Sequence, residues 1–318
     1  MNKIRTITIC GPTASGKTYL GVELAKKLNG EIVSADSIQI YKGVDIASAK
    51  PDFEEMQGIK HHLIDFVSPE DDYSVAQFVK DASECIDEIN KKGKTPIIVG
   101  GTGLYIDTLI NNIQLLENSF DEKIRDNLNL RLEKEGIEKL YSELQTIDPA
   151  AANKIHKNNY VKVLRALEIY YSSGKTLTQQ NELSHSQESL YDNIYIGLSV
   201  KNREYLYDRI NKRVDLMIED GLVEEAKNFY SKRIGNTSSQ AIGYKELKPF
   251  LDGLLSIEEC VENLKKATRN YAKRQMTWFR RNDKINYFYI DDYVDKNCLV
   301  EDVLKFLNER EVIDAKEN

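Results

Sequence analysis

The sequence has little cysteine, and this scarcity excludes two classes of small stabilised protein. Its four cysteines, spread over 318 residues, form no Cys-x-x-Cys or Cys/His pattern. The spacing predicts reduced, mostly buried thiols in place of a disulfide framework or a zinc site. The adjacent His61 and His62 have no third ligand at a suitable spacing, so we expect them to pack or to form hydrogen bonds without binding a metal.

Long apolar runs are also missing. No stretch approaches the roughly 20 apolar residues that a membrane-spanning helix needs, and the first residues lack the features of a secretion signal. We therefore expect a cytoplasmic protein with no membrane partner. With 41% hydrophobic residues, the chain is long enough for one large or two modest domains.

The N-terminal part of the sequence contains short β-branched apolar runs that alternate with helical patterns. The runs are residues 4–10, 31–34 and 96–100, and the helical patterns lie at 17–28 and 74–91. This alternation predicts an α/β core whose parallel sheet is covered on both faces.

The pattern changes at about residue 115, where Glu, Lys, Leu and Asn recur at helical spacing without a strand candidate. Strand patterns return at 193–200 and 285–291. We therefore expect a discontinuous core, 1–114 and 193–318, with an all-helical insertion at 115–192. The polar segment 174–190 is predicted to be a mobile connection.

Residues 11–18, GPTASGKT, match the G-x-x-x-x-G-K-[ST] pattern between a predicted strand and a predicted helix. In such a P-loop, backbone N–H groups and the helix N-terminus surround a phosphate. Lys17 is expected to neutralise the terminal phosphate and Thr18 to hold Mg²⁺. The predicted phosphate-binding residues are Gly11, Pro12, Thr13, Ala14, Ser15, Gly16, Lys17 and Thr18.

The loop alone leaves three chemistries open: phosphoryl transfer, a nucleotide-driven switch and displacement of diphosphate as a leaving group. The sequence has no Asn-Lys-x-Asp base-reading motif, which disfavours a GTPase switch. A small-molecule kinase remains open. The other loops at the carboxyl edge of the sheet must distinguish between these chemistries, because ligands bind there in such folds.

Two polar loops are predicted at that edge. Asp36 follows the second strand and is a candidate general base, although it could also be a helix N-cap or a carboxylate that supports magnesium. Thr102 lies on the glycine-rich turn after the third strand, which would bring a hydroxyl to a ligand or be only a tight connection.

Seven segments together resemble the bacterial tRNA dimethylallyltransferase (isopentenyltransferase) family. They occur in order over nearly the whole chain: GPTASGKT at 11–18, DSIQIYKGVDIASAKP at 36–51, HHLID at 61–65, GGTGLY at 100–105, RINKR at 209–213, AIGYKE at 241–246 and AKRQMTWFR at 272–280. The resemblance implies a P-loop NTPase-like α/β core. It also implies transfer of a dimethylallyl group from its diphosphate to N6 of the adenosine immediately 3′ of the anticodon.

The resemblance assigns roles to particular residues. Asp36 would be the catalytic base and Thr102 would contact the target nucleotide. Lys17 and Arg213, with Mg²⁺, would stabilise the departing diphosphate, and Arg209 lies on the same helical face. An isolated arginine at either position would otherwise be read as a solvated helix charge.

The resemblance also implies contacts with tRNA. The segment Asp36, Ser37, Ile38 and Gln39 matches a tRNA-contacting stretch, and in the insertion Lys162 and Arg165 belong to another. There Asn159 and Lys162 depart from the family pattern. An extruded adenosine requires the P-loop and Asp36 to open into a single cavity.

The distribution of charge along the chain affects whether it can bind tRNA. The net charge of −7 by itself disfavours nucleic acid, but residues 263–281 contain seven Lys and Arg and no acid. Lys265, Arg269 and Lys273 recur every four residues and predict a basic helix face, which could either bind phosphates or pack against acids.

A monomer is expected. The alternatives are an isopentenyltransferase of free adenine nucleotide and a small P-loop kinase.

Overall fold

The computed structural model describes residues 3–114, 122–184, 187–231, 234–235 and 237–310. The chain forms two compact units, Met1–Ile110 with Leu190–Asn318, and Asn111–Ser189. Each unit has its own core and is described by itself. Among the described residues, no helix combines the length and apolar character needed to cross a membrane.

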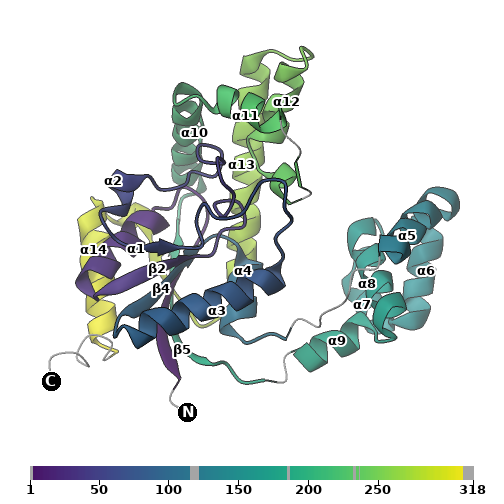
Figure 1. Ribbon diagram of the computed structural model, residues 1–318, viewed down its shortest axis with the longest axis horizontal. Coiled ribbons are helices and arrows are strands. Elements are labelled where there is room, and N and C mark those ends of the chain that lie inside the picture. Colours follow the sequence, from purple (N-terminus) through teal and green to yellow (C-terminus); the bar gives the residue numbers. More distant parts are fainter. Residues whose placement is uncertain (1–2, 115–121, 185–186, 232–233, 236, 311–318) are drawn as a thin grey trace. The chain divides into compact units, whose positions relative to one another are not determined.

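The first unit is built on a six-stranded parallel sheet with strand order β3-β2-β4-β1-β5-β6 (Figure 1). Its strands are β1 (Ile4–Cys10), β2 (Gly30–Ser34), β3 (His61–His62), β4 (Thr95–Gly100), β5 (Tyr191–Ser199) and β6 (Ile285–Tyr289). The sheet confirms the predicted α/β class. The sequence missed β3, because two residues are too few to show a strand period.

Both faces of the sheet are buried, as the continuous apolar runs predicted. Ile7, Ile9 and Ile32 belong to one core cluster, whereas Val33 and Ile98 belong to another. Since neighbouring strand residues point to opposite faces, helices must cover both sides.

Helices α1 (Lys17–Lys27) and α14 (Lys296–Asn308) contribute Leu20, Leu24 and Val303 to one cluster, and α3 (Val75–Lys91) and α4 (Gly103–Ile110) contribute to the other. The remaining helices of this unit are α2 (Phe53–Met56), α10 (Arg203–Glu219), α11 (Leu222–Tyr230), α12 (Tyr244–Leu251) and α13 (Ile257–Phe279). Short 3-10 turns lie at Ser238–Gln240 and Ile290–Asp292.

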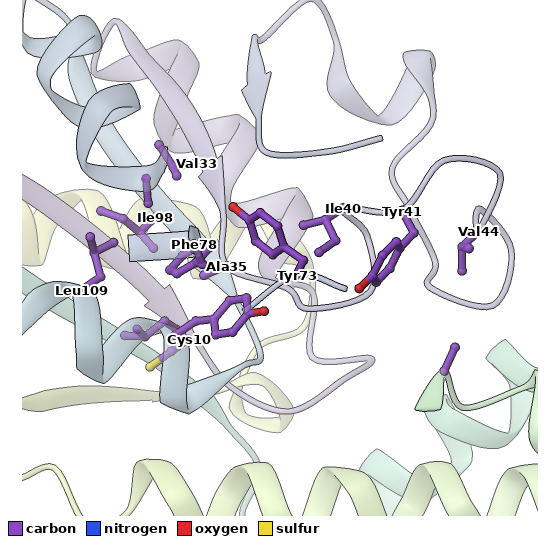
Figure 2. Close-up of a cluster of buried hydrophobic side chains, with 14 of the residues drawn as sticks. Cys10, Val33, Ala35, Ile40, Tyr41, Val44, Tyr73, Phe78, Ile98 and Leu109 are labelled. Atoms are coloured by element: carbon purple, nitrogen blue, oxygen red, sulfur yellow. The ribbon is translucent and has the colours of Figure 1, made fainter. Parts of the chain in front are cut away.

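The second of these clusters continues past the end of the sheet. Figure 2 shows Ile98 of β4 and Phe78 of α3 in this cluster, together with Ile40, Tyr41 and Val44 from the segment that follows β2. Tyr41 and Val44 are fully buried. This packing anchors the segment between β2 and α2 against the core.

The second unit contains helices and no strand among its described residues. They are α5 (Glu122–Glu135), α6 (Ile137–Ile147), α7 (Pro149–Lys154), α8 (Tyr160–Ser173) and α9 (Leu177–Ser184). Its core includes Leu128, Leu140, Leu144, Val163 and Leu167.

Its bounds differ from the predicted insertion. The unit begins at Asn111 instead of 115, and Tyr191 and Asp192, which we expected in the insertion, belong to β5 and pair with β1. Part of the segment expected to be a mobile connection forms α9, so that prediction was wrong there. The Asp148 carboxylate fixes the start of α9 by accepting from Thr178 N at 2.9 Å and Thr178 Oγ1 at 2.7 Å.

The histidines and cysteines follow the expectations in part. His62 Nε2 is 2.7 Å from the buried Glu31 carboxylate, which confirms a hydrogen-bonding role. The described residues contain no cluster of three or more His, Cys, Asp or Glu suited to a metal. All four cysteines are free, but Cys298 is exposed and Cys85 only partly buried, so "mostly buried" was too strong.

Candidate active site

The GPTASGKT segment forms a tight loop between β1 and α1. Gly16 adopts φ 92° immediately before Lys17, the first residue of α1, and Ala14 adopts φ 62°. A Cβ on Gly11 would lie 2.5 Å from the Leu198 carbonyl oxygen, so a side chain there is excluded. The loop has the strand-loop-helix context of a P-loop.

Two side chains of the loop suit an anion. Ser15 is buried, and its hydroxyl has no hydrogen-bond partner among the described residues, an arrangement that a phosphate oxygen would complete. Lys17 Nζ donates to the Pro12 carbonyl at 2.8 Å. Burial, followed by the charge of Arg213, lowers the pKa of Lys17 to about 8. A bound anion would favour its protonated form.

Two arginines of α10 form hydrogen bonds with the P-loop. Arg213 Nη1 donates to Thr13 Oγ1 at 3.2 Å, and Arg209 Nε donates to the Ala14 carbonyl at 2.8 Å. Neither is a solvated helix charge, and burial lowers the pKa of Arg213. Arg213 also lines the cavity described below, whereas Arg209 supports the loop backbone.

Asp36 lies just beyond β2 in a turn. Its Oδ1 accepts from Ile38 N at 2.9 Å and Gln39 N at 3.3 Å. No helix begins there, so the helix N-cap alternative does not hold. Within the described residues, Oδ2 has no hydrogen-bond partner, which leaves it available for a proton or a metal.

Thr102 fixes the same turn from the loop after β4. Its Oγ1 accepts from Ser37 N at 3.1 Å and lies 3.4 Å from Ser37 Oγ. The Thr102 amide donates to the Ala35 carbonyl at 3.2 Å. Thr102 is therefore in contact with the segment that carries Asp36, and is more than a tight connection.

Sequence reasoning missed Gln275 of α13, which joins the P-loop to the β4 loop. Its side chain is buried, with Oε1 accepting from Thr13 N at 2.8 Å and Nε2 donating to the Gly101 carbonyl at 3.0 Å. A Cβ on Gly101 would meet Gln275 Nε2 at 2.2 Å. The signal was available in AKRQMTWFR, where helical spacing places the amide on the same face as Ala272 and Phe279.

These elements enclose one cavity of about 410 Å³, within the range of small-molecule sites. P-loop residues, Arg213 and Asp36 all line it, so the single cavity expected from the sequence exists. Of the predicted site residues, those in its wall are Thr13, Lys17, Thr18, Asp36, Ser37, Ile38, Gln39 and Arg213.

The cavity wall also includes polar residues that were not predicted to line it. Tyr271 and Arg274 come from α13 and Lys245 from α12. Burial, followed by the charge of Asp36, raises the pKa of the Tyr271 hydroxyl. The apolar part of the wall includes Val214 and Met217 of α10.

Two predicted tRNA contacts, Lys162 and Arg165, lie on α8 in the second unit, whereas the residues of the cavity wall all belong to the first unit. Lys162 is exposed, and Arg165 is 2.9 Å from Glu168. Asn159, which departs from the family pattern, caps α8 by accepting from Lys162 N at 3.3 Å.

The predicted basic face of α13 lies mostly along α10. Lys265 is 2.7 Å from Asp215, Arg269 Nη1 donates to Asn211 Oδ1 at 2.6 Å, and Lys273 lies over the Tyr207 ring. The alternative of packing against acids therefore holds for Lys265, whereas Arg269 and Lys273 meet uncharged side chains. The exposed cations of the segment are Lys266, Lys273, Arg274, Arg280 and Arg281.

Comparison with known proteins decides the family. The model of the IPP transferase family matches residues 39–282. The chain belongs to the IPP transferase family. The tRNA dimethylallyltransferase of Caldanaerobacter subterraneus subsp. tengcongensis is 46% identical over 309 residues, covering 96% of this chain and 98% of the relative. That of Bacillus subtilis is 46% identical over 290 residues, with 91% and 92% covered.

Solved structures of IPP transferases show the same fold. The full-length tRNA isopentenylpyrophosphate transferase of Bacillus halodurans aligns with a TM-score of 0.72 and 43% identity, covering 96% of each chain. A eukaryotic dimethylallyltransferase acting on tRNA aligns with a TM-score of 0.80 and 32% identity, covering 96% of this chain and 80% of that one. The resemblance seen in the sequence is thus confirmed over nearly the full length.

Proposed function

We propose that this chain transfers a dimethylallyl group from dimethylallyl diphosphate to N6 of the adenosine immediately 3′ of a tRNA anticodon, releasing diphosphate. One observation carries the proposal: Lys17, Arg213 and Asp36 line a single cavity. A phosphate-binding loop and a carboxylate in one space suit alkyl transfer from a diphosphate to a weakly acidic amine.

The donor half of the reaction separates charge. As the bond between C1 and the bridging oxygen stretches, negative charge grows on the diphosphate and positive charge on the allylic carbon. Lys17 and Arg213 are held in place by Pro12 and Thr13, so they stabilise this charge without reorganising. Arg209 keeps the Ala14 backbone in position.

Magnesium would add to this charge stabilisation. Thr18, the last residue of the P-loop pattern, lines the cavity, and its hydroxyl would hold the ion, with the diphosphate supplying further oxygens. Mg²⁺ bound to phosphates commonly uses one or two protein ligands, so the small oxygen donor set here fits it. When bound, the ion acts as a Lewis acid at the leaving group.

The acceptor half needs a base. The adenine amine loses a proton as it forms the new C–N bond, and Asp36 Oδ2 is free to take that proton while Oδ1 holds the turn. Thr102 keeps the turn in place through Ser37. We propose that Ser37 and Ile38, which line the cavity, contact the extruded nucleotide.

The Gln39 side chain is already engaged within the protein. Its Nε2 donates to the Ser48 and Ala49 carbonyls at 3.3 and 3.1 Å, and its Oε1 accepts from Ser34 Oγ at 3.2 Å. A contact between this amide and tRNA would require one of these bonds to open. Lys162 and Arg165 of α8 are also proposed to contact the tRNA.

Two alternatives predict different substrates. An isopentenyltransferase of free adenine nucleotide would prenylate AMP, and a small kinase would consume ATP without a prenyl donor. The full-length likeness to proteins named tRNA dimethylallyltransferase favours neither alternative.

The test is to incubate the purified chain with radiolabelled dimethylallyl diphosphate, Mg²⁺ and unmodified tRNA or AMP in parallel. We expect label in tRNA only, in the nucleotide 3′ of the anticodon after nuclease digestion. Label in AMP, or none in RNA, would overturn the proposal.

A further inference from the structure

One wall of the cavity is a loop without helix or strand. Residues 45–49 follow the Asp36 turn, and Ala47, Ser48 and Ala49 line the cavity. A loop of this kind has no ladder of backbone hydrogen bonds to fix it. Ala49 N donates to the Ile46 carbonyl within the loop at 2.9 Å, and the N–H groups of residues 45–47 need acceptors from elsewhere.

Glu225 of α11 supplies those partners. Its Oε2 accepts from Asp45 N at 3.0 Å and Ile46 N at 2.7 Å, and its Oε1 accepts from Ala47 N at 2.9 Å. Three consecutive amides thus converge on one carboxylate. Hydrogen bonds to an ionised acceptor are roughly twice as strong as neutral ones.

A buried tyrosine holds the carboxylate in turn. Tyr244 of α12 is fully buried, and its hydroxyl donates to Glu225 Oε1 at 2.8 Å. The close packing extends to Gly243, where an added Cβ would meet the Ala47 Cβ at 3.3 Å. The orientation of Glu225 is therefore set by α12 as well as by the loop.

The contacts continue from the loop to the proposed base. The Ser48 and Ala49 carbonyls accept from Gln39 Nε2, and Gln39 N donates to Asp36 Oδ1. Glu225 is thus connected through loop 45–49 and Gln39 to the turn that carries Asp36. The residues proposed for the diphosphate, Thr13, Lys17 and Arg213, lie on other elements.

We propose that Glu225 is a positioning residue for the acceptor side of the cavity. By fixing loop 45–49, it sets the wall against which the extruded nucleotide lies and the orientation of the Asp36 turn. This inference rests on the proposed function. It predicts that loss of the Glu225 carboxylate impairs use of tRNA while binding of the diphosphate donor is retained.

The test compares Glu225→Gln with Glu224→Gln in the full chain. Glutamine keeps one oxygen but turns an NH₂ group toward backbone donors, whereas the neighbouring Glu224 is exposed and its carboxylate lies 3.7 Å from Lys227 Nζ. For Glu225→Gln we expect kcat/KM for tRNA to fall on the order of 10- to 100-fold, as for a misplaced catalytic group, with the KM for dimethylallyl diphosphate nearly unchanged. Glu224→Gln should match the unaltered chain in both.

Amide hydrogen exchange provides a readout that does not depend on activity. Faster exchange at residues 45–47 in Glu225→Gln, with unchanged exchange in the β1 and β4 strands, supports the inference. Unchanged exchange in the loop, or an equal loss for both substrates, overturns it. If the unaltered chain prenylates no tRNA, the proposed function fails, while exchange still tests whether Glu225 holds the loop.

Tyr244→Phe covers the case in which Glu225→Gln does not fold. It removes only the hydroxyl that holds Oε1, so we expect the same preferential loss with tRNA at a smaller size, a few-fold. No difference between the two substrates in Tyr244→Phe would count against the inference.

Discussion

At the scale of single residues, the two oxygens of Asp36 have separate tasks. Oδ1 accepts from the amides of Ile38 and Gln39, and Oδ2 is left for chemistry. The base and turn-forming interpretations of this carboxylate therefore do not compete. This division makes it possible to remove the proposed base without removing the turn.

Asp36→Asn tests that division. Asparagine retains an oxygen for the Ile38 and Gln39 amides but is not a base, so we expect prenyl transfer to tRNA to fall roughly 10²- to 10⁴-fold while the fold is retained. Transfer rates and thermal unfolding would be measured beside Asp87→Asn, an exposed position on α3. Near-normal turnover in Asp36→Asn would remove Asp36 from the mechanism.

Lys17 predicts a pH dependence of diphosphate binding. Its pKa of about 8 in the free protein, lowered chiefly by burial, means that its charge is lost as the pH rises through 8. A bound diphosphate favours the protonated form, so affinity should fall by up to about tenfold per pH unit above pH 8, with proton uptake on binding. Titration calorimetry with inorganic diphosphate in two buffers measures both quantities.

Lys17→Arg serves as the control, because a guanidinium stays charged over this range. The pH dependence should disappear in Lys17→Arg. An identical dependence in both proteins would show that another group titrates.

The stability of the free protein depends on pH in the opposite direction. The unfolded lysine, with its ordinary pKa of 10.5, binds more protons between pH 8 and 10.5, so this group adds stability as the pH rises.

At the scale of secondary-structure elements, α13 connects loops that are far apart in the chain. Gln275 joins the loop after β1 to the loop after β4, and Trp278 Nε1 donates to Asp107 Oδ2 of α4 at 2.6 Å. A Cβ on Gly103 would meet the Trp278 ring at 2.2 Å, so α4 approaches α13 closely. The helix acts as a spacer that fixes the distance between the two loops.

Gln275→Glu should expose this role. The second carboxylate oxygen would face the Gly101 carbonyl in place of the amide that now donates to it, so we expect a loss of roughly 1–3 kcal/mol in the free energy of unfolding. Denaturant titration beside Asn270→Asp, an exposed position on the same helix, measures the effect. Equal stabilities of the two variants would contradict the bridging role.

At the scale of the whole molecule, the acidic total charge conceals an uneven distribution. Residues 263–281 carry seven cations and no acid, although the net charge is −7. The structure then divides these cations: Lys265 is paired with Asp215 and Glu262, whereas Arg274 is exposed at the cavity wall. Only the exposed ones are placed to meet phosphates.

Salt dependence tests this division. We expect tRNA affinity of the full chain to fall with added salt, and Arg274→Gln to reduce the slope of log K against log[salt] by roughly 0.7–0.9 for one lost phosphate contact. Lys265→Gln should leave the slope unchanged, because that cation already has protein partners. Filter binding or fluorescence anisotropy over a salt series measures it, and equal slopes in the two variants would contradict the assignment.

The sequence by itself determined the α/β class, the P-loop and the family. These features depend on local patterns, namely β-branched runs, a glycine-rich turn and short ordered motifs, and each can be read within a few neighbouring residues. The two-residue β3 and the capped helix α9 were not predicted from the sequence, because their stability comes from partners distant in the chain, such as Asp148 for α9.

Tertiary structure alone decided which polar side chains act together. Gln275 with Thr13 and Glu225 with residues 45–47 are separated by more than a hundred positions in the chain, and no periodicity relates them. Packing also reassigned Lys265 from a candidate phosphate contact to an ion pair with Asp215. Spacing reveals what a side chain can do, but its partner is chosen by the packing of helices and loops around the sheet.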